Sequence, residues 1–201
     1  YVYTWTHGSP ERKPIAEAKR LLAEAGYPNG RQSGKPLILY FDTTGTGPDD
    51  KAHYDWFRKQ FEKIDIELVI RSTDYNRFQD KMLKGTAQLF QWGWHADYPD
   101  ADNFLQLLYG PNAGQANDAR FKLPAFDRLY EQARSLPDSP ERNRLYRKMT
   151  ELVLAYAPWK LGVHRVGSSL AHPWVIGFKP HPLLHAQWKY IDIDTARRDK
   201  N

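Results

Sequence analysis

The sequence predicts an α/β fold in which a mainly parallel sheet is flanked by helices. Apolar runs that lack strand breakers alternate with segments whose apolar residues recur at helical spacing. The run at 36–41 is almost continuously apolar, as expected of a strand that is covered on both faces. Because parallel strands need long crossovers, a β-α-β-α-β order predicts parallel pairing with right-handed connections.

The first half of the chain supplies this order. Pro14 suits the first turn of a helix and Gly26 suits its end. The apolar residues between them form one stripe: Ile15, Ala18, Leu21, Leu22 and Ala25. Asp74 is expected to cap a later helix that ends at Gly85. The predicted strands are 36–41, 66–70 and 87–92, and the predicted helices between them are 50–63 and 74–85.

Loops follow the three strands at 43–47, 72–74 and 94–97, and parallel pairing brings all three to one edge of the sheet. In open α/β sheets, ligands bind at the carboxyl ends of the strands. The third loop belongs to the densest aromatic run of the chain, at 91–104, which also holds three carboxylates. The sequence therefore predicts a ligand site in this loop.

Individual residues predict how the 91–104 stretch runs. Gly93 permits a bend or a close backbone approach, and Pro99 stops any regular ladder. From Asn103 the pattern becomes helical, and one face of that helix carries apolar residues: Phe104, Leu107 and Leu108.

Asp97 is flanked by Trp94 and Tyr98. Apolar walls remove water and make an unpaired charge costly. A ligand ammonium would form a charge-assisted hydrogen bond with Asp97 and would also meet the π face of Trp94. The alternative interpretation is that the aromatic residues are plain core and that the aspartates are solvated turn residues or helix caps.

The second half of the chain is predicted to be mainly helical. A loop at 109–123 is long enough to be functional. Helices are expected at 124–134 and 139–156, the second beginning with a Ser139 cap. Strands are expected at 160–166 and, more briefly, near 190–193. The buried face of the longer helix should carry Leu145, Met149, Leu152, Val153 and Tyr156.

The composition excludes several classes of protein. The chain has 201 residues, enough for one domain with a real core. It has no cysteine, which excludes disulfides and thiol catalysis, and no apolar run of about 18 residues that could span a membrane. Its net charge of +5 is scattered beside acidic residues, which argues against nucleic-acid binding. A start at Tyr1, without Met or a signal peptide, predicts a fragment.

Catalytic and metal sites are weakly indicated. Asp97, Asp100 and Asp102 could serve as acid–base carboxylates in a hydrolase or as ligands of a hard cation, but the Gly and Glu positions of an EF-hand are absent. His181 and His185 are four residues apart, but Pro182 between them argues against a helix that would align them on zinc. The absence of a catalytic constellation favours a binding protein.

Three stretches resemble one family. The first is Gly93-Trp94-His95-Ala96-Asp97-Tyr98-Pro99-Asp100 with Asn103-Phe104-Leu105. The second is the helix and turn at 18–30, and the third is Ala157-Pro158-Trp159 with Val175-Ile176-Gly177-Phe178. Together they resemble the family 5 extracellular solute-binding proteins of ABC transporters, which include the dipeptide- and oligopeptide-binding proteins.

This resemblance implies one lobe of a type II periplasmic binding protein, and it covers only part of the family's length. Residues 1–170 would form the C-terminal ligand-binding lobe, and 171–201 would be a tail that returns to an N-terminal lobe absent from this sequence. Such proteins bind a peptide or another small solute between two lobes and deliver it to ABC permease subunits. The resemblance thus also implies a periplasmic location, no cofactor and no enzymatic activity.

The resemblance also assigns roles within the site. Asp97 would take the α-ammonium of the ligand, Trp94 would pack over the ligand, and the backbone around Gly93 and His95 would pair with it. Gln91 and Tyr98 complete the candidate ligand-binding set.

Gln91 departs from the family pattern. Some oligopeptide binders have a cationic residue at this position and use it for the peptide carboxylate. Gln91 cannot form that ion pair, so the carboxylate is held elsewhere, or the ligand is a dipeptide or not a peptide. Because family members also carry nickel complexes, sugars and opines, the sequence leaves the ligand class open.

Two geometric expectations follow. The Asp97 carboxylate should face an open surface near Trp94, with no Lys or Arg side chain fully neutralising it. The segment 173–193 holds too much apolar surface for a solvated tail. We expect it to make few contacts with the core formed by 36–92 and to bury its aromatic residues at a chain–chain contact or an edge. Its apolar residues are Trp174, Val175, Ile176, Phe178, Leu183, Leu184, Trp188 and Ile191.

Overall fold

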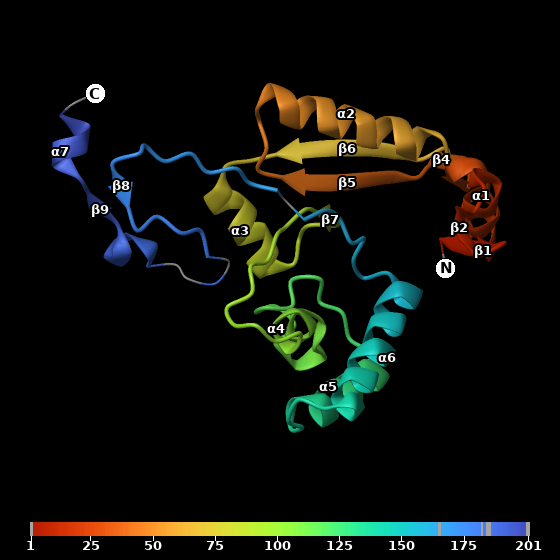
Figure 1. The fold of residues 1–201 in the computed structure, drawn as a ribbon. Helices are drawn as coiled ribbons and strands as arrows, with labels where there is room; N and C mark the ends of the chain where they lie inside the picture. The colour runs from red at the N-terminus through yellow and green to blue at the C-terminus, as the bar shows by residue number, and fades with distance from the viewer. Residues whose placement is uncertain (1, 165, 182, 184–185, 200–201) are drawn as a thin grey trace.

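The computed structural model describes residues 2–164, 166–181, 183 and 186–199, and it has the predicted α/β architecture (Figure 1). The central sheet has the strand order β6-β5-β7, with both pairings parallel. Its strands are β5 (Ile38–Thr43), β6 (Glu67–Ser72) and β7 (Leu89–Phe90). Three residues that entered the predictions, Pro182, Leu184 and His185, lie outside the described residues.

Two helices lie on opposite sides of this sheet (Figure 1). Helix α2 (Pro48–Glu62) packs over Phe41 and Leu68, and its Tyr54 completes a buried cluster with them. Helix α3 (Tyr75–Lys84) lies on the other side, where its Lys81 forms an ion pair of 2.5 Å with the fully buried Asp42 of β5.

The ends of α3 are those that the sequence predicts. The Asp74 side chain caps the helix by accepting a hydrogen bond of 3.0 Å from the backbone N–H of Arg77. Gly85 ends the helix in the left-handed conformation, with a φ of 66°. Both signals are local in the sequence, which is why they could be recognised there.

Strand β7 is shorter than the predicted strand at 87–92. The backbone N–H of Tyr40 in β5 donates to Oε1 of Gln88 at 2.9 Å. In a longer β7, a backbone carbonyl would accept this hydrogen bond instead of the Gln88 side chain. After Phe90 the chain leaves the sheet. The Trp92 ring packs against Phe78 and Tyr75 of α3, with centroid distances of 5.1 and 6.5 Å.

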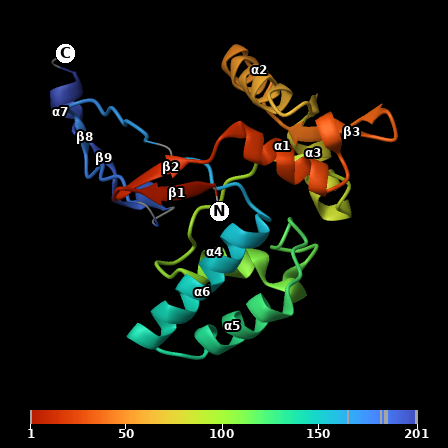
Figure 2. The ribbon, with the colours of Figure 1, turned by 90° about the vertical axis from the view of Figure 1, so that its right-hand side faces the viewer.

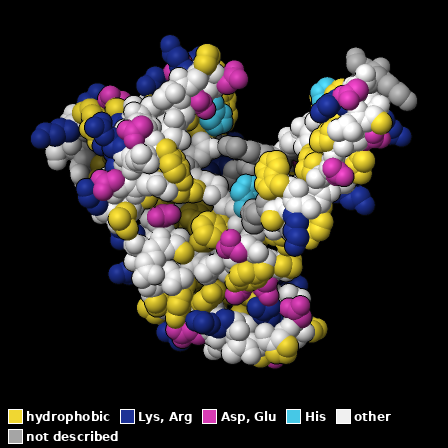
Figure 3. All heavy atoms as spheres, turned by 90° about the vertical axis from the view of Figure 1, so that its left-hand side faces the viewer, with side chains coloured by type: hydrophobic (Ala, Val, Ile, Leu, Met, Phe, Trp, Pro, Cys, Tyr) yellow, Lys and Arg dark blue, Asp and Glu magenta, His cyan; other side chains and the backbone are white. Residues whose placement is uncertain are grey.

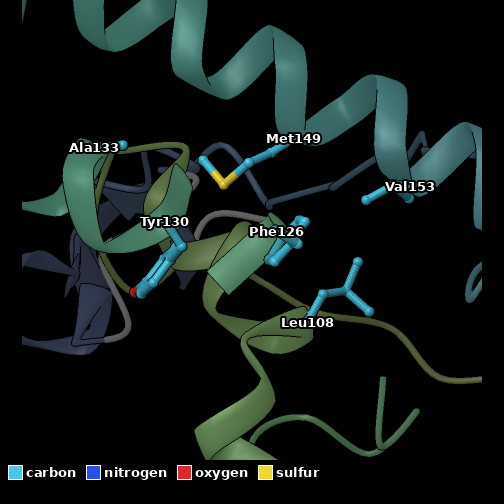
Figure 4. Close-up of a cluster of buried hydrophobic side chains, with 6 residues drawn as sticks. All are labelled: Leu108, Phe126, Tyr130, Ala133, Met149 and Val153. Carbon is cyan, nitrogen blue, oxygen red and sulfur yellow. The ribbon is translucent and has the colours of Figure 1, made fainter. Parts of the chain in front are cut away.

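A second core forms around α5 (Pro124–Arg134) and α6 (Pro140–Tyr156), whose limits agree with the predicted helices. The Ser139 side chain caps α6 by accepting a hydrogen bond of 3.2 Å from the backbone N–H of Arg142. Figure 4 shows the buried side chains that the two helices share with the preceding segment: Leu108, Phe126, Tyr130, Ala133, Met149 and Val153.

Short helices connect the sheet to this second core. They are α4 (Asp102–Leu105), η2 (Gln106–Leu108) and η3 (Gly110–Asn112). The predicted loop that follows is held by the fully buried Asn117, whose Nδ2 donates to the carbonyls of Tyr109 at 3.0 Å and Phe121 at 2.9 Å. This side chain replaces the backbone pairing that an irregular loop lacks.

Two residues predicted on buried helix faces are exposed. Phe104 is 42% exposed because the α-helix ends at Leu105 and the tighter turn that follows points Leu107 and Leu108 inward instead. Tyr156 is 61% exposed because it lies in the last turn of α6, where it meets only the edge of Phe121.

The N-terminal segment contains an antiparallel hairpin that the sequence did not predict. It consists of β1 (Tyr3–Thr6) and β2 (Ser9–Arg12), and α1 (Ile15–Glu24) follows it (Figure 2). None of the residues of α1 is buried, so its apolar stripe is largely solvent-exposed. The chain then forms η1 (Pro28–Gly30), β3 (Arg31–Gln32) and β4 (Lys35–Pro36) before it enters the sheet.

The predicted strand at 160–166 is wrong for the residues described there. Residues 160–164 and 166 form no strand, and Val163 and Val166 are 91% and 97% exposed. A β-favouring run forms a strand only when a neighbouring strand can pair with it, and none of the strands described pairs with this segment.

We call the described residues from 171 to 199 the C-terminal arm. In it, β8 (Val175–Ile176) pairs antiparallel with β9 (Asp192–Ile193), which is the short strand predicted near 190–193. The arm also contains η4 (Gln187–Tyr190) and α7 (Thr195–Arg198), and in Figure 1 it lies apart from α2, α5 and α6. Trp174 stacks on His172 at 4.2 Å, and Trp188 is 79% exposed. None of the arm's described residues belongs to either buried cluster, as expected for this segment. The expected burial of its aromatic residues at a chain–chain contact or an edge stays a prediction, since Trp188 is exposed in the single chain.

Candidate ligand-binding site

The candidate site is the loop between β7 and α4, residues 91–101. Phe90, the last residue of β7, is the register partner of Asp42, and Thr43 is the partner of Ser72. The three strands therefore end at one edge of the sheet, as the sequence predicts. Figure 3 views the molecule from this side, where hydrophobic and acidic side chains surround a hollow near the centre.

Asn103 organises the loop. Its side chain is fully buried, and its Oδ1 accepts hydrogen bonds from the Trp94 indole Nε1 at 2.8 Å and from the Asp97 backbone N–H at 3.1 Å. Its Nδ2 donates to Oδ2 of Asp97 at 3.0 Å. One amide thus fixes both the indole ring and the carboxylate. The sequence pattern identifies Asn103 only as the start of a helix, and the resemblance of the Asn103-Phe104-Leu105 motif is the signal that marks it as part of the site.

Asp97 is solvent-exposed and lies beside Trp94, which is 41% exposed. In the part of the chain that the structure describes, no lysine or arginine forms an ion pair with Asp97. Its side-chain partner is the neutral amide of Asn103, which orients the carboxylate without neutralising it. A carboxylate that is held in place but not paired can accept a cation from outside the chain.

The other candidate residues also lie on the surface. Gln91, Gly93, His95 and Tyr98 are all exposed. A Cβ added to Gly93 would find no heavy atom within 4 Å, apart from those of its chain neighbours. The packing of the chain itself therefore does not require glycine at this position.

Asp100 has a different environment from Asp97. Its Oδ2 accepts a hydrogen bond of 2.5 Å from Nη1 of Arg142, and its Oδ1 accepts one of 3.1 Å from the Tyr146 hydroxyl. Arg142 is buried in α6, and its Nε donates to the Ala133 carbonyl at 3.1 Å. Asp100 thereby ties the candidate loop to the second core.

These contacts determine the ionisation of Asp100. Burial alone would raise the pKa of its carboxyl group, but bonds from the Asp102 backbone, Arg142 and Tyr146 outweigh burial and hold the pKa below its usual value. Burial, and then the Asp100 carboxylate, raise the pKa of the Tyr146 hydroxyl. Asp100 is therefore ionised at neutral pH and cannot act as a general acid there.

Asp102 differs from both. It is the first residue of the four-residue α4, and its Oδ1 is buried without a hydrogen-bond partner in the described structure. Burial, and to a smaller extent the nearby Asp102 and Asp100 carboxylates, raise the pKa of the Tyr98 hydroxyl. Among the described residues, no hydrogen bond joins the side chains of any two of these aspartates. They have three separate roles and do not form a proton-sharing pair of the kind that hydrolases use.

The described residues contain neither a metal-binding cluster nor a helix that could span a membrane. Across the described ranges, no three His, Cys, Asp or Glu side chains gather as they would around a metal ion. Of the residues considered for a zinc site, His185 and the intervening Pro182 lie outside the described residues. Each described helix is too short or too polar to cross a bilayer.

Comparison with known proteins places the chain in a family. Residues 2–116 match the model of the bacterial extracellular solute-binding proteins, family 5, middle region. The chain belongs to this family. The fold agrees with the predicted lobe of a type II periplasmic binding protein, and solute-binding proteins of this family are carriers rather than enzymes. Membership of this family contradicts the alternative prediction of a hydrolase.

Individual relatives support this assignment. Heme-binding protein A of Haemophilus influenzae is 31% identical over 89% of this chain and 32% of its own length. The periplasmic oligopeptide-binding protein OppA of Escherichia coli is 28% identical over 85% of this chain and 30% of its own length. The periplasmic binding protein DppA from Helicobacter pylori, solved with the peptide STSA, matches 77% of this chain and 30% of its own at 29% identity and a TM-score of 0.63. The chain thus spans about a third of the length of the curated relatives it matches.

Proposed function

We propose that this chain provides one face of the ligand cleft in a substrate-binding component of an ABC importer, which binds peptides or similar small amine-bearing solutes. The single observation that carries this proposal is the state of Asp97. Its carboxylate is exposed, fixed by the buried Asn103, adjacent to an indole ring, and not paired with a cation of the described chain. Relatives that are named as oligopeptide- or dipeptide-binding proteins support the ligand class.

The chemistry of recognition follows from this arrangement. A ligand α-ammonium would donate a charge-assisted hydrogen bond to the oxygens of Asp97. The face of Trp94 would attract the same cation and cover the first residue of the ligand. The indole cannot rotate freely because its N–H is bonded to Asn103, so its face is already in place before the ligand arrives.

The backbone next to Asp97 would bind an extended ligand. The stretch from Gln91 to His95 leaves the sheet without a regular partner strand and is exposed. A peptide can pair with such a backbone as an added strand, and the absence of a side chain at Gly93 leaves room for its close approach. Gln91 can donate and accept hydrogen bonds but carries no charge, so the ligand carboxylate would be held elsewhere.

The remaining roles concern the whole protein. Residues 1–170 would form the C-terminal ligand-binding lobe, and 171–201 would return to an N-terminal lobe. The exposed Trp188, Tyr190 and Ile193 of the C-terminal arm are apolar surface suited to such a contact. By analogy with periplasmic relatives, the protein would act in the periplasm and deliver its ligand to membrane permease subunits.

The test is equilibrium binding to the whole protein by titration calorimetry. Trialanine should bind saturably and be recovered unhydrolysed, and N-acetyl-trialanine should bind at least about tenfold more weakly because it lacks the ammonium. Equal affinities for the two peptides, or no binding of either, would contradict the proposed role of Asp97.

A further inference from the structure

We propose that a groove beside Trp92 is a ligand subsite for a cationic side chain, such as that of lysine or arginine. This inference rests on the proposed function and adds to it a preference at one position of the ligand. It also assigns a role to Trp92, a residue of the aromatic run that the candidate set did not include.

The groove lies between α3 and the loop around residues 114–118 and has a volume of about 490 Å³, within the range of small-molecule sites. Its apolar lining comes from Met82, Leu83 and Trp92, and carboxylates are supplied by Asp80 and Asp118. No lysine or arginine is among the residues that line it. An apolar floor with acidic groups matches a side chain that has an aliphatic stem and a charged end.

Of the two groove carboxylates, Asp118 is the one without an ion pair among the described residues. It is partly buried and forms no ion pair within the described segments. Burial raises the pKa of its carboxyl group, and Arg120 opposes that change. The Arg120 guanidinium lies at the edge of the groove, where its Nη2 donates to the Leu83 carbonyl at 2.6 Å and the Met82 carbonyl at 3.3 Å, and it forms no ion pair with Asp118 in the described structure. A cation in the groove would supply Asp118 with the ion pair that the described residues do not form with it.

Asp80 is only weakly engaged. Its Oδ2 accepts a hydrogen bond of 2.7 Å from Lys84 Nζ, but both side chains are at least half exposed. Exposed pairs of this kind contribute little and exchange readily. A ligand cation can therefore share Asp80 with Lys84.

The register of the sheet connects the groove to the ligand path. Phe90 pairs with Asp42, and Asp42 faces α3, as its bond to Lys81 shows. Trp92 lies beyond the end of β7, and its ring meets Phe78 of α3 on this same side of the sheet. A ligand strand paired along 91–95 would place the side chain opposite Trp92 on the same side. That side chain enters the groove.

The experiment measures binding to the whole protein by titration calorimetry. The ligands are trialanine peptides with one lysine at position one, two or three, and three matched peptides with the uncharged norleucine instead. At one position, lysine should bind about tenfold or more tightly than norleucine, as expected of a bond to a charged group. Asp118→Asn should remove most of that ratio and leave trialanine affinity unchanged.

The control is Glu62→Gln, which removes one negative charge at the far end of α2 and lines no part of the groove. It should leave the lysine-to-norleucine ratio as it is, and thermal unfolding should show both variants folded. If trialanine binds but no position prefers lysine, or the preference survives Asp118→Asn combined with Asp80→Asn, the subsite is disproved while the proposed function stands. If none of the peptides binds, the proposed function fails, and the subsite fails with it.

Discussion

Asn103 and Asp97 are joined in both directions: the Asn103 amide donates to the Asp97 carboxylate at 3.0 Å, and its carbonyl oxygen accepts from the Asp97 backbone N–H at 3.1 Å. The second bond closes the loop on itself, and the first aims the carboxylate outward. Because Asn103 is fully buried and neutral, it positions Asp97 without cancelling its charge. The ligand-binding hypothesis depends on this relationship.

Asn103→Ala should therefore damage both stability and binding. The substitution removes the acceptor of the Trp94 indole N–H and of the Asp97 backbone N–H, and each lost hydrogen bond costs about 0.5–1.5 kcal/mol. We expect a lower free energy of unfolding in urea and weaker binding of trialanine. Asn143→Ala, at an exposed site of α6, is the control and should change neither by more than about 0.5 kcal/mol. A stable Asn103→Ala protein with normal affinity would show that the amide does not organise the site.

Gly93→Val should separate folding from binding. The added side chain points into open space, so the free energy of unfolding should change by no more than about 0.5 kcal/mol. Trialanine affinity should fall because the side chain occupies the path of the ligand backbone.

Gly30→Ala provides the opposite case. A Cβ there would lie 1.8 Å from the Asp65 carbonyl oxygen, and the φ of Gly30 is 64°. This variant should lose more than about 1 kcal/mol of stability. If Gly93→Val is the variant that unfolds, or if it binds trialanine normally, the ligand does not approach at Gly93.

Asp100 should make stability depend on pH in the acid range. Its pKa is lowered in the folded chain, so the unfolded chain binds the proton more readily. The stabilisation from its bonds to Arg142 and Tyr146 is present above the unfolded pKa of about 3.9 and is lost as pH falls through the folded pKa. Asp100→Asn should therefore be destabilised at pH 7, with a deficit that shrinks as the pH is lowered below about 4. Urea unfolding at several pH values measures this, and a deficit that stays constant with pH would refute the ion-pair account.

The sequence predicts the elements whose signals are local. Ser139 and Asp74 mark helix starts through bonds to residues three positions away, and Gly85 ends its helix through its own backbone conformation. The parallel sheet follows from the alternation of strands and helices. The ligand edge follows in turn from the direction of the strands.

The features that the sequence missed depend on distant partners. Asp97, Asp100 and Asp102 look alike in the sequence, but their partners differ in the structure. Asn103 binds Asp97, and Asp100 is paired with Arg142, which lies 42 positions after it. The apolar run at 160–166 lacks a partner strand in the described structure, so its β propensity has no effect. The β1–β2 hairpin is exposed on nearly all its residues and therefore has no alternating pattern to reveal it.

The most direct test of the central claim is the affinity of Asp97→Asn for trialanine and for N-acetyl-trialanine, measured by titration calorimetry on the whole protein. Asparagine keeps an oxygen that can accept the Asn103 bond but removes the charge, so the loop should remain in place. The substitution should weaken trialanine binding by about 1.5–3 kcal/mol, the range for a hydrogen bond to a charged group, and should barely change binding of the acetylated peptide. Equal losses for the two peptides would show that Asp97 shapes the loop and does not recognise the ligand ammonium.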